Sequence, residues 1–284
     1  MNIKLAKTNR EFLELYENMI DKYPERTQLF RANLTGDLDE PLSKDKFRGA
    51  IYQNESVVLL FLNANPYNLQ LFSTTANVDA VDYIAKVVVE ENIDIVGVQG
   101  NKFHTSRFIE AYKKLCEAKF VCRLQMDIMR LDCIIKPAKL FGEVTKATMQ
   151  DLPKIMEYMT AFSKEALHEN LTVASALEKA KSQIDKGGIY LLRNEQNEVL
   201  SITMISRAIK NGRAISLVYT PDCYRNKGYS SSLLYQVCMN LFAEGNQFVT
   251  LFVDKTNPVS NRVYEKLGFV ITEDSYDYVM KKGC

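Results

Sequence analysis

The sequence predicts an α/β fold of the α+β type, arranged as two tandem halves. Three observations lead to this prediction. The chain has 284 residues, which is long for one compact core and favours two domains. Its composition, 46% hydrophobic and 25% charged, is typical of globular proteins and excludes the disordered and fibrous classes. Short apolar runs that suit strands alternate with stretches of helical apolar spacing, as in folds that mix both elements.

In the first half, a helix is expected over residues 10–24, where apolar residues recur at helical spacing until Pro24. Residues 56–63 and 68–74 should be the strands of a hairpin, because the sequence ANPY between them is typical of a turn. The remaining elements expected in this half are a helix at 78–92, a buried strand at 93–100, a helix at 105–118 and an alternating strand at 123–135.

The second half is expected to repeat much of this order, because each half ends in the order strand, helix, strand, helix, strand. Its hairpin turns on the sequence NEQNE. The elements expected are helices at 148–166 and 174–186, a hairpin at 188–208, a strand at 214–220, a helix at 229–245, a strand at 248–254, a helix at 258–268, and a closing strand or strands at 269–282.

The repeated order indicates a weak internal duplication. Residues 93–115 can be aligned with residues 248–267, although the identities are few. Similar packing of two unrelated halves is the alternative. The segment KPAKLFGE around Pro137 is the expected boundary, so the sequence predicts domains at 1–137 and 138–284.

Composition also bounds the partners and the compartment. The net charge of +1, from 36 basic and 35 acidic residues, gives no electrostatic reason to expect nucleic acid or a membrane surface. The longest purely apolar run, VVLLFL, is far shorter than the roughly 20 residues that cross a bilayer, and the N-terminus has no apolar signal core. The six cysteines include no C-x-x-C pair, so we expect reduced cysteines, no metal site and a cytoplasmic protein. His104 and His168 are expected in surface or packing roles.

One loop in the second half has the character of an anion site. In VYTPDCYRNKGYSSSLL, Arg225 and Lys227 precede a glycine and three serines, and a helix is expected to start near Gly228 to Ser230. A helix start exposes unpaired backbone N–H groups and the positive end of the helix dipole, and small residues let an anion approach them. A phosphate cradle is the functional interpretation, and an ordinary capped turn is the alternative. The loop has one glycine, so it is neither a Walker loop nor a dinucleotide fingerprint.

The next helix carries a polar edge. In LFVDKTNPVSNRVYEKLGF, Asn257 is the expected helix cap, Pro258 the first helical residue and Gly268 the terminator. The polar residues Asn257, Asn261 and Tyr264 should share one edge of this helix. The apolar stripe is expected at every fourth residue, at Val259, Val263 and Leu267.

Together, these two stretches resemble the GNAT superfamily of acyl-CoA-dependent N-acyltransferases, in particular the branch that carries YTPPEYRGKGYA and LFTD–NPxSNxIYxKIGF. The resemblance covers residues 213–281 well, and the rest of 140–284 agrees in element order. It implies two tandem GNAT-like domains, each with a mixed, largely antiparallel central sheet flanked by helices. The first half lacks R-x-x-G-x-G/A in its counterpart turn, LFSTTANVDAVDYIAK, and is interpreted as a degenerate copy that lost the cofactor.

The resemblance implies an N-acetyltransferase that uses acetyl-CoA to acetylate a primary amine of a small molecule or peptide by direct attack. Two positions depart from the family pattern, since Asn226 replaces the usual glycine and Ser230 stands where glycine or alanine is commoner. Both are compatible with the cradle, because asparagine tolerates positive φ and serine is small. The cofactor-binding residues that the resemblance implies are Leu217, Val218, Tyr219, Arg225, Asn226, Lys227, Gly228, Tyr229, Ser230, Asn257, Ser260 and Asn261.

In the family, a tyrosine at the position of Tyr264 is the general acid that protonates the departing thiolate, and packing alone is the alternative role. A general base is not evident from the sequence. Ser216 lies on the cofactor strand, bulk water is another candidate, and four acidic residues expected near that end of the sheet are better explained as solvated loop residues: Asp254, Glu273, Asp274 and Asp277. Two functional alternatives stay open, a non-catalytic acyl-CoA-binding protein whose first half docks a partner, and a transferase of a longer acyl group.

Overall fold

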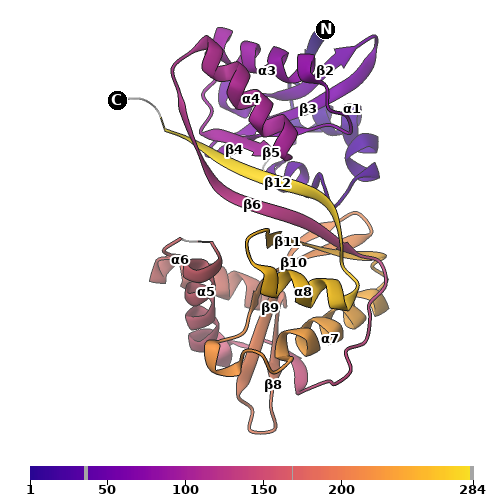
Figure 1. The fold of residues 1–284 in the computed structure, drawn as a ribbon, viewed down its shortest axis with the longest axis vertical. Coiled ribbons are helices and arrows are strands. Elements are labelled where there is room, and N and C mark those ends of the chain that lie inside the picture. Colours follow the sequence, from indigo (N-terminus) through magenta and orange to yellow (C-terminus); the bar gives the residue numbers. More distant parts are fainter. Residues whose placement is uncertain (35–37, 168, 282–284) are drawn as a thin grey trace. The chain divides into compact units, whose positions relative to one another are not determined.

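The computed structural model describes residues 1–34, 38–167 and 169–281, and they divide into two compact units (Figure 1). Unit 1 comprises Met1–Asp127 together with the C-terminal segment from Glu273, and unit 2 comprises Ile128–Thr272. Both units combine a mixed sheet with flanking helices, which confirms the predicted fold class.

The sheet of unit 1 has the strand order β1-β2-β3-β4-β5-β12-β6. Strands β1 to β4 pair antiparallel, β4 pairs parallel to β5, and β5 pairs antiparallel to β12. The predicted hairpin around ANPY is confirmed, whereas strand β2 was not expected from the sequence. The elements are β1 (Asn2–Leu5), α1 (Asn9–Lys22), α2 (Gln28–Asn33), η1 (Lys44–Lys46), β2 (Arg48–Gln53), β3 (Ser56–Ala64), β4 (Tyr67–Phe72), α3 (Val78–Glu90), β5 (Gly97–Gly100), α4 (Lys102–Leu115), and most of β6 (Lys119–Leu131) and β12 (Val270–Lys281).

Helices cover both faces of this sheet because its strands are apolar on both sides. In β3, Leu59 and Phe61 pack with helices α3 and α4, whereas Leu60 and Leu62 pack with α1. Alternate residues of a strand point to opposite faces, so a continuous apolar run buries both.

The sheet of unit 2 has the order β7-β8-β9-β10-β11, with the end of β6 beside β11. Strands β7, β8, β9 and β10 pair antiparallel in this order, and β10 pairs parallel to β11. The elements are β7 (Glu143–Lys146), η2 (Met149–Asp151), α5 (Leu152–Ala166), α6 (Val173–Asp185), β8 (Ile189–Arg193), β9 (Val199–Ile209), β10 (Gly212–Tyr219), η3 (Asp222–Tyr224), α7 (Tyr229–Ala243), β11 (Phe248–Asp254) and α8 (Pro258–Leu267).

The helices and strands of the two halves follow one another in the same order, from β1 to β6 and again from β7 to β12. The last strands are exchanged, since β12 pairs with β5 whereas the end of β6 lies beside β11. Figure 1 shows β12, in yellow, alongside β5 of unit 1. The contacts therefore divide the chain after Asp127 and before Glu273. The division into domains at 1–137 and 138–284, which follows the internal repeat of the sequence, stays a prediction.

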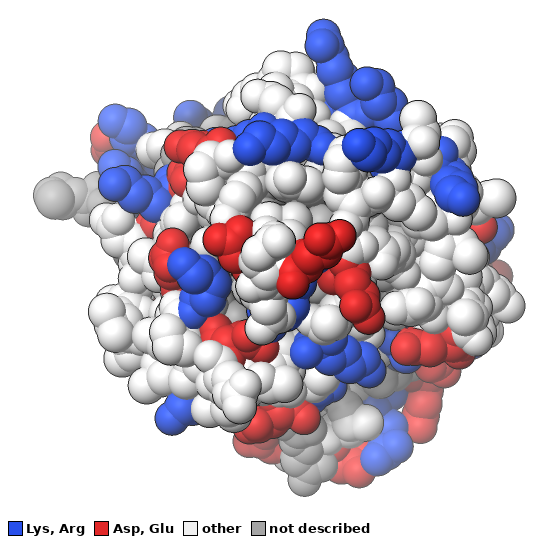
Figure 2. Space-filling view, turned by 90° about the horizontal axis from the view of Figure 1, so that it is seen from below, with Lys and Arg blue, Asp and Glu red and all other residues white. Residues whose placement is uncertain are grey.

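Figure 2 shows Lys and Arg side chains interspersed with Asp and Glu over one face. Among the described residues, no helix is long and apolar enough to cross a bilayer. The described cysteines at 116, 122, 133, 223 and 238 are free thiols, and Cys284 and His168 lie outside the described residues.

Candidate functional site

Strands β10 and β11 of unit 2 separate from each other. They pair only over Gly212–Ala214 and Phe248–Thr250, although β10 continues to Tyr219 and β11 to Asp254. Parallel strands that diverge leave backbone N–H and C=O groups on their facing edges without a ladder partner. This opening can therefore take an extended, amide-containing group between the strands.

A bulge in β10 lies within the separated stretch. The register of β10 on β9 shifts between Ser216 and Tyr219, and Leu217 has φ 51°, in the left-handed region. Such a φ is uncommon for leucine, and a bulge re-aims the backbone of its strand. The side-chain oxygen of Ser216 is buried without a hydrogen-bond partner. The bulge thus places an unsatisfied polar atom beside the opening.

Helix α7 begins with an uncapped N-terminus. Its N-cap is Gly228, with φ 82° and no side-chain hydrogen bond, and its first helical hydrogen bond runs from Ser232 N to Gly228 O at 3.0 Å. The N–H groups of residues 229–231 are therefore the unpaired donors of this helix start. The loop before it also uses positive φ at Asn226, φ 61°, as expected for a tight approach. These features favour an anion at this helix start.

The corresponding helix of unit 1 is closed. The side chain of Asn77 accepts a hydrogen bond from Ala80 N at 3.0 Å at the start of α3. The asparagine cap thus occupies one of the N–H donors that an anion would use, that of Ala80. The lack of a phosphate loop in the first half stays a prediction.

Arg225 and Lys227, the two cations of the loop, are held by other partners in this structure. Arg225 donates from Nη2 to Glu165 Oε2 at 2.6 Å and from Nε to Thr220 O at 2.8 Å, and it forms an ion pair with Asp222. Lys227 donates from Nζ to Cys223 O at 3.0 Å. In this structure the donors of the cradle are therefore backbone N–H groups. Glu165 was missed by sequence reasoning, because nothing local marks a residue 60 positions from Arg225.

The ends of helix α8 confirm the sequence prediction. Asn257 accepts a hydrogen bond from Ser260 N at 3.1 Å, Pro258 is the first helical residue, and Gly268 ends the helix with φ 101°. Local side-chain chemistry at these three positions is sufficient to define the helix.

The predicted faces of α8 are wrong in one respect. Val259 is 65% exposed, whereas Tyr264 and Leu267 are buried. Val263, Tyr264 and Leu267 pack in the core of unit 2, because a helix has 3.6 residues per turn and its inward face does not follow a strict spacing of four. Tyr264 therefore lies on the buried face of α8 instead of on a polar edge.

Tyr264 packs in the core of unit 2, and its ring meets Phe269 edge-on at a centroid distance of 5.8 Å. Burial raises the pKa of Tyr264, so its phenol is protonated at neutral pH. One turn earlier, the side-chain oxygen of Asn261 is buried without a hydrogen-bond partner. This part of α8 can offer a proton donor and a free acceptor.

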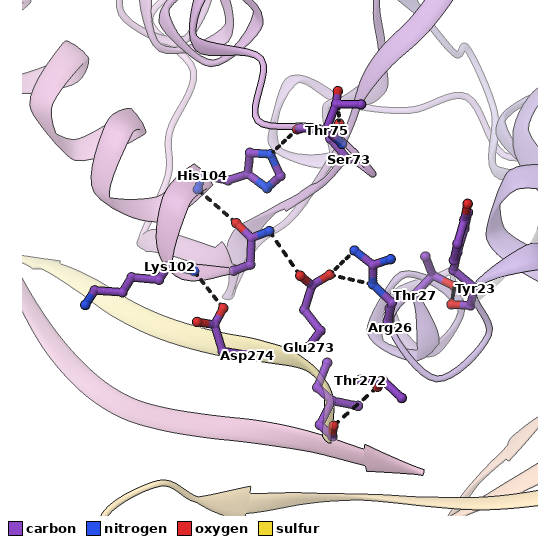
Figure 3. A network of polar contacts seen from close by, with 12 residues as sticks. Tyr23, Arg26, Thr27, Ser73, Thr75, Lys102, His104, Thr272, Glu273 and Asp274 are labelled. Atoms are coloured by element: carbon purple, nitrogen blue, oxygen red, sulfur yellow. Dashed lines mark hydrogen bonds and ion pairs between the residues drawn. The ribbon is translucent and has the colours of Figure 1, made fainter. Parts of the chain in front are cut away.

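Three acidic residues expected near this end of the second sheet belong to unit 1, because β12 pairs with β5. Glu273 forms an ion pair with Arg26 (Figure 3). Asp277 is 5% exposed and forms an ion pair with Arg123 at 3.0 Å. The interpretation of Glu273 and Asp277 as solvated loop acids is therefore wrong.

The remaining acidic candidates are also engaged in local hydrogen bonds. Asp274 of unit 1 accepts from Lys102 N at 2.9 Å. Asp254 of unit 2 accepts from Thr256 N at 2.8 Å. These local roles explain both carboxylates without a part in catalysis.

His104 has the packing role predicted for it. It is 2% exposed, and its Nε2 lies 3.0 Å from Thr75 O (Figure 3). Burial lowers the pKa of His104, which favours the neutral ring.

Residues 196–278 match the family model described as FR47-like protein, and this range includes both the α7 helix start and Tyr264. A GNAT-family acetyltransferase from Colwellia psychrerythraea has a similar structure, with 10% identity and a TM-score of 0.57 over 99% of this chain and 100% of that one. The chain has the GNAT acetyltransferase fold.

Two further solved structures are similar to this chain. A GCN5-related N-acetyltransferase from Sphaerobacter thermophilus is 14% identical, with a TM-score of 0.57 over 89% of this chain and 84% of that one. A Drosophila protein is 12% identical, with a TM-score of 0.62 over 98% of each chain. The sequence matches no curated protein. Since the likenesses span nearly the whole chain, the GNAT fold extends over both halves.

Proposed function

We propose that unit 2 is an acetyl-CoA-dependent N-acetyltransferase that acetylates a primary amine of a small molecule or peptide by direct attack. One observation carries this proposal: the strand that separates from its parallel neighbour leads, through residues 220–228, to the uncapped start of α7. A diphosphate suits the first site and a pantetheine amide chain suits the second.

The residues of unit 2 fit coenzyme A. The N–H groups of residues 229–231 would bind the diphosphate, and the backbone of residues 217–219 would bind the pantetheine amides. A side chain at Gly228 would be strained at φ 82° and would meet Phe141 at 3.3 Å, which favours glycine beside the cradle. The unsatisfied oxygens of Ser216 and Asn261 would accept N–H groups of a ligand.

The chemistry needs a proton donor and a place for the amine proton. Acetyl-CoA supplies the acetyl group as a thioester. Tyr264 would donate its phenolic proton to the departing sulfur, because burial keeps it protonated. Backbone N–H groups of the bulged strand would stabilise charge on the carbonyl oxygen. The amine proton would leave through water, since the acidic candidates are held by other partners.

The burial of Tyr264 also favours a second candidate, a non-catalytic acyl-CoA-binding protein in which this ring only packs. Replacing Tyr264 by Phe separates the two, because it keeps the ring and removes the proton donor. We expect Tyr264→Phe to retain CoA binding in calorimetry while turnover with an amine panel falls about 100-fold. Tyr235→Phe, on α7 in the same core, is the control. Binding of CoA by the unmodified protein without acetylation of any amine would favour the second candidate.

We further propose that the first half is a degenerate copy that does not bind the cofactor. The start of α3 supports this proposal, because the Asn77 side chain already accepts a hydrogen bond from Ala80 N, at 3.0 Å, at the place where a diphosphate would bind.

A further inference from the structure

Glu165, near the end of α5, contacts both ends of the segment that leads from β10 to α7. Its Oε1 accepts a hydrogen bond from the hydroxyl of Tyr219, the last residue of β10, at 2.9 Å. Its Oε2 accepts from Nη2 of Arg225, in the loop before α7, at 2.6 Å. One carboxylate thus joins α5, β10 and the loop before the open helix start.

The Arg225 guanidinium is held in one orientation by several partners. Its Nε donates to Thr220 O at 2.8 Å, which closes the loop on its own first residue. The same group lies over the ring of Tyr219, 5.6 Å from its centroid. A planar guanidinium bound on several edges is more rigid than a lysine ammonium. Because Glu165 holds this guanidinium, it also holds the loop that carries Arg225.

We propose that Glu165 is a positioning residue of the acetyl-CoA site, which fixes Arg225 and Tyr219 so that residues 220–228 hold the start of α7 open for the diphosphate. This inference rests on the proposed function. Burial alone would raise the pKa of Glu165, but the hydrogen bonds from Arg225 and Tyr219 outweigh it and lower the pKa. The carboxylate is therefore ionised at neutral pH and can hold Arg225.

The folding of α5 does not depend on the Glu165 side chain. The buried face of α5 is formed by Ile155, Tyr158, Met159 and Ser163, and the Glu165 side chain is 43% exposed. Loss of its carboxylate should therefore leave α5 packed. Glu157 is a matched control, because it lies on the same helix, is exposed, and pairs only locally with Lys154 at 2.7 Å.

The first test compares two donors, acetyl-CoA and S-acetylpantetheine, which lacks the diphosphate. We expect Glu165→Ala to lower kcat/KM for acetyl-CoA about three- to tenfold through KM, with a smaller loss for S-acetylpantetheine. Glu165→Gln should be intermediate, because its amide oxygen still accepts from Tyr219 but no longer pairs with Arg225. Glu157→Ala should match the unmodified protein. An equal loss with both donors, or no loss, would overturn the inference.

The second test does not need activity. Hydrogen exchange in the ligand-free protein should be faster at residues 220–228 in Glu165→Ala than in Glu157→Ala, because the loop has lost its anchor. Unchanged exchange there contradicts the positioning role. If the unmodified protein fails to bind CoA, the proposed function fails, whereas hydrogen exchange still decides whether Glu165 holds the loop.

Discussion

Gly228 starts α7 at the place in the second half where Asn77 starts α3 in the first. Asn77 closes its helix with a side-chain hydrogen bond to Ala80 N at 3.0 Å, whereas Gly228 leaves the first donors of α7 without a side-chain partner. The asparagine thus accepts one N–H group of its helix start, whereas the glycine leaves the N–H groups that we propose for the anion without a side-chain partner.

Replacing Gly228 by Ala should weaken CoA binding about tenfold or more, because the added Cβ is strained at φ 82° and lies 3.3 Å from the Phe141 ring beside the cradle. Isothermal calorimetry measures the effect. Gly245→Ala is the control, since Gly245 has φ 91° with nothing within 4 Å of the added Cβ. It should lose stability without losing CoA affinity, and equal losses of affinity in both variants would count against a local effect at the cradle.

Removing the asparagine cap of α8 should lower activity, whereas removing that of α3 should not. Asn77→Ala and Asn257→Ala each remove a side-chain cap, so each should lower the free energy of unfolding by about 1 kcal/mol. We expect kcat/KM for acetyl-CoA to fall in Asn257→Ala and to be unchanged in Asn77→Ala. Denaturant titration and steady-state kinetics check the two effects separately. A loss of activity in Asn77→Ala at full folding would contradict a cofactor-free first half.

The alkaline side of the pH–rate profile should be insensitive to Tyr264. Burial raises the pKa of this phenol above its ordinary value of 10.0, and the acid acts in its protonated form. Activity should therefore rise as the amine substrate deprotonates and show no fall from Tyr264 up to about pH 10. A fall near about pH 8 that disappears in Tyr264→Phe would mean that the phenol ionises far more easily than its burial allows.

Unit 1 should lose stability in acid through His104. Burial lowers the pKa of its ring in the folded state, while the carbonyl of Thr75 and the carboxylates of Glu273 and Asp274 act in the opposite direction and Arg26 adds to the lowering. The folded state thus favours the neutral ring. The stability is fully present above the unfolded pKa of about 6.5 and is lost as the pH falls toward the folded pKa.

Urea titration at several pH values checks this dependence. The variant His104→Gln keeps a donor for Thr75 O but does not titrate, so its unfolding midpoint should change less between about pH 7.5 and pH 5. The same acid dependence in both proteins would assign it to other groups.

The sequence predicts well what depends on neighbouring residues. The cap, first residue and terminator of α8 at Asn257, Pro258 and Gly268 follow from local backbone and side-chain chemistry. The start of α7 near Gly228 follows from glycine and the apolar spacing after it. These local signals were sufficient to find the two elements that form the candidate site.

Long-range pairing was not predictable in the same way. Nothing in residues 269–282 indicates that β12 pairs with β5 of the other unit, because an apolar alternating strand suits several neighbours. For the same reason the acids of this strand were assigned to the wrong half. Glu165 escaped notice because its partners Arg225 and Tyr219 are 60 and 54 positions away.

A crystal structure of the protein with coenzyme A tests the proposed cofactor site most directly. We expect the diphosphate at the N–H groups of residues 229–231, the pantetheine between β10 and β11, and the sulfur beside the hydroxyl of Tyr264. Coenzyme A bound elsewhere, or a cradle filled by the protein's own side chains in the presence of saturating ligand, would contradict it.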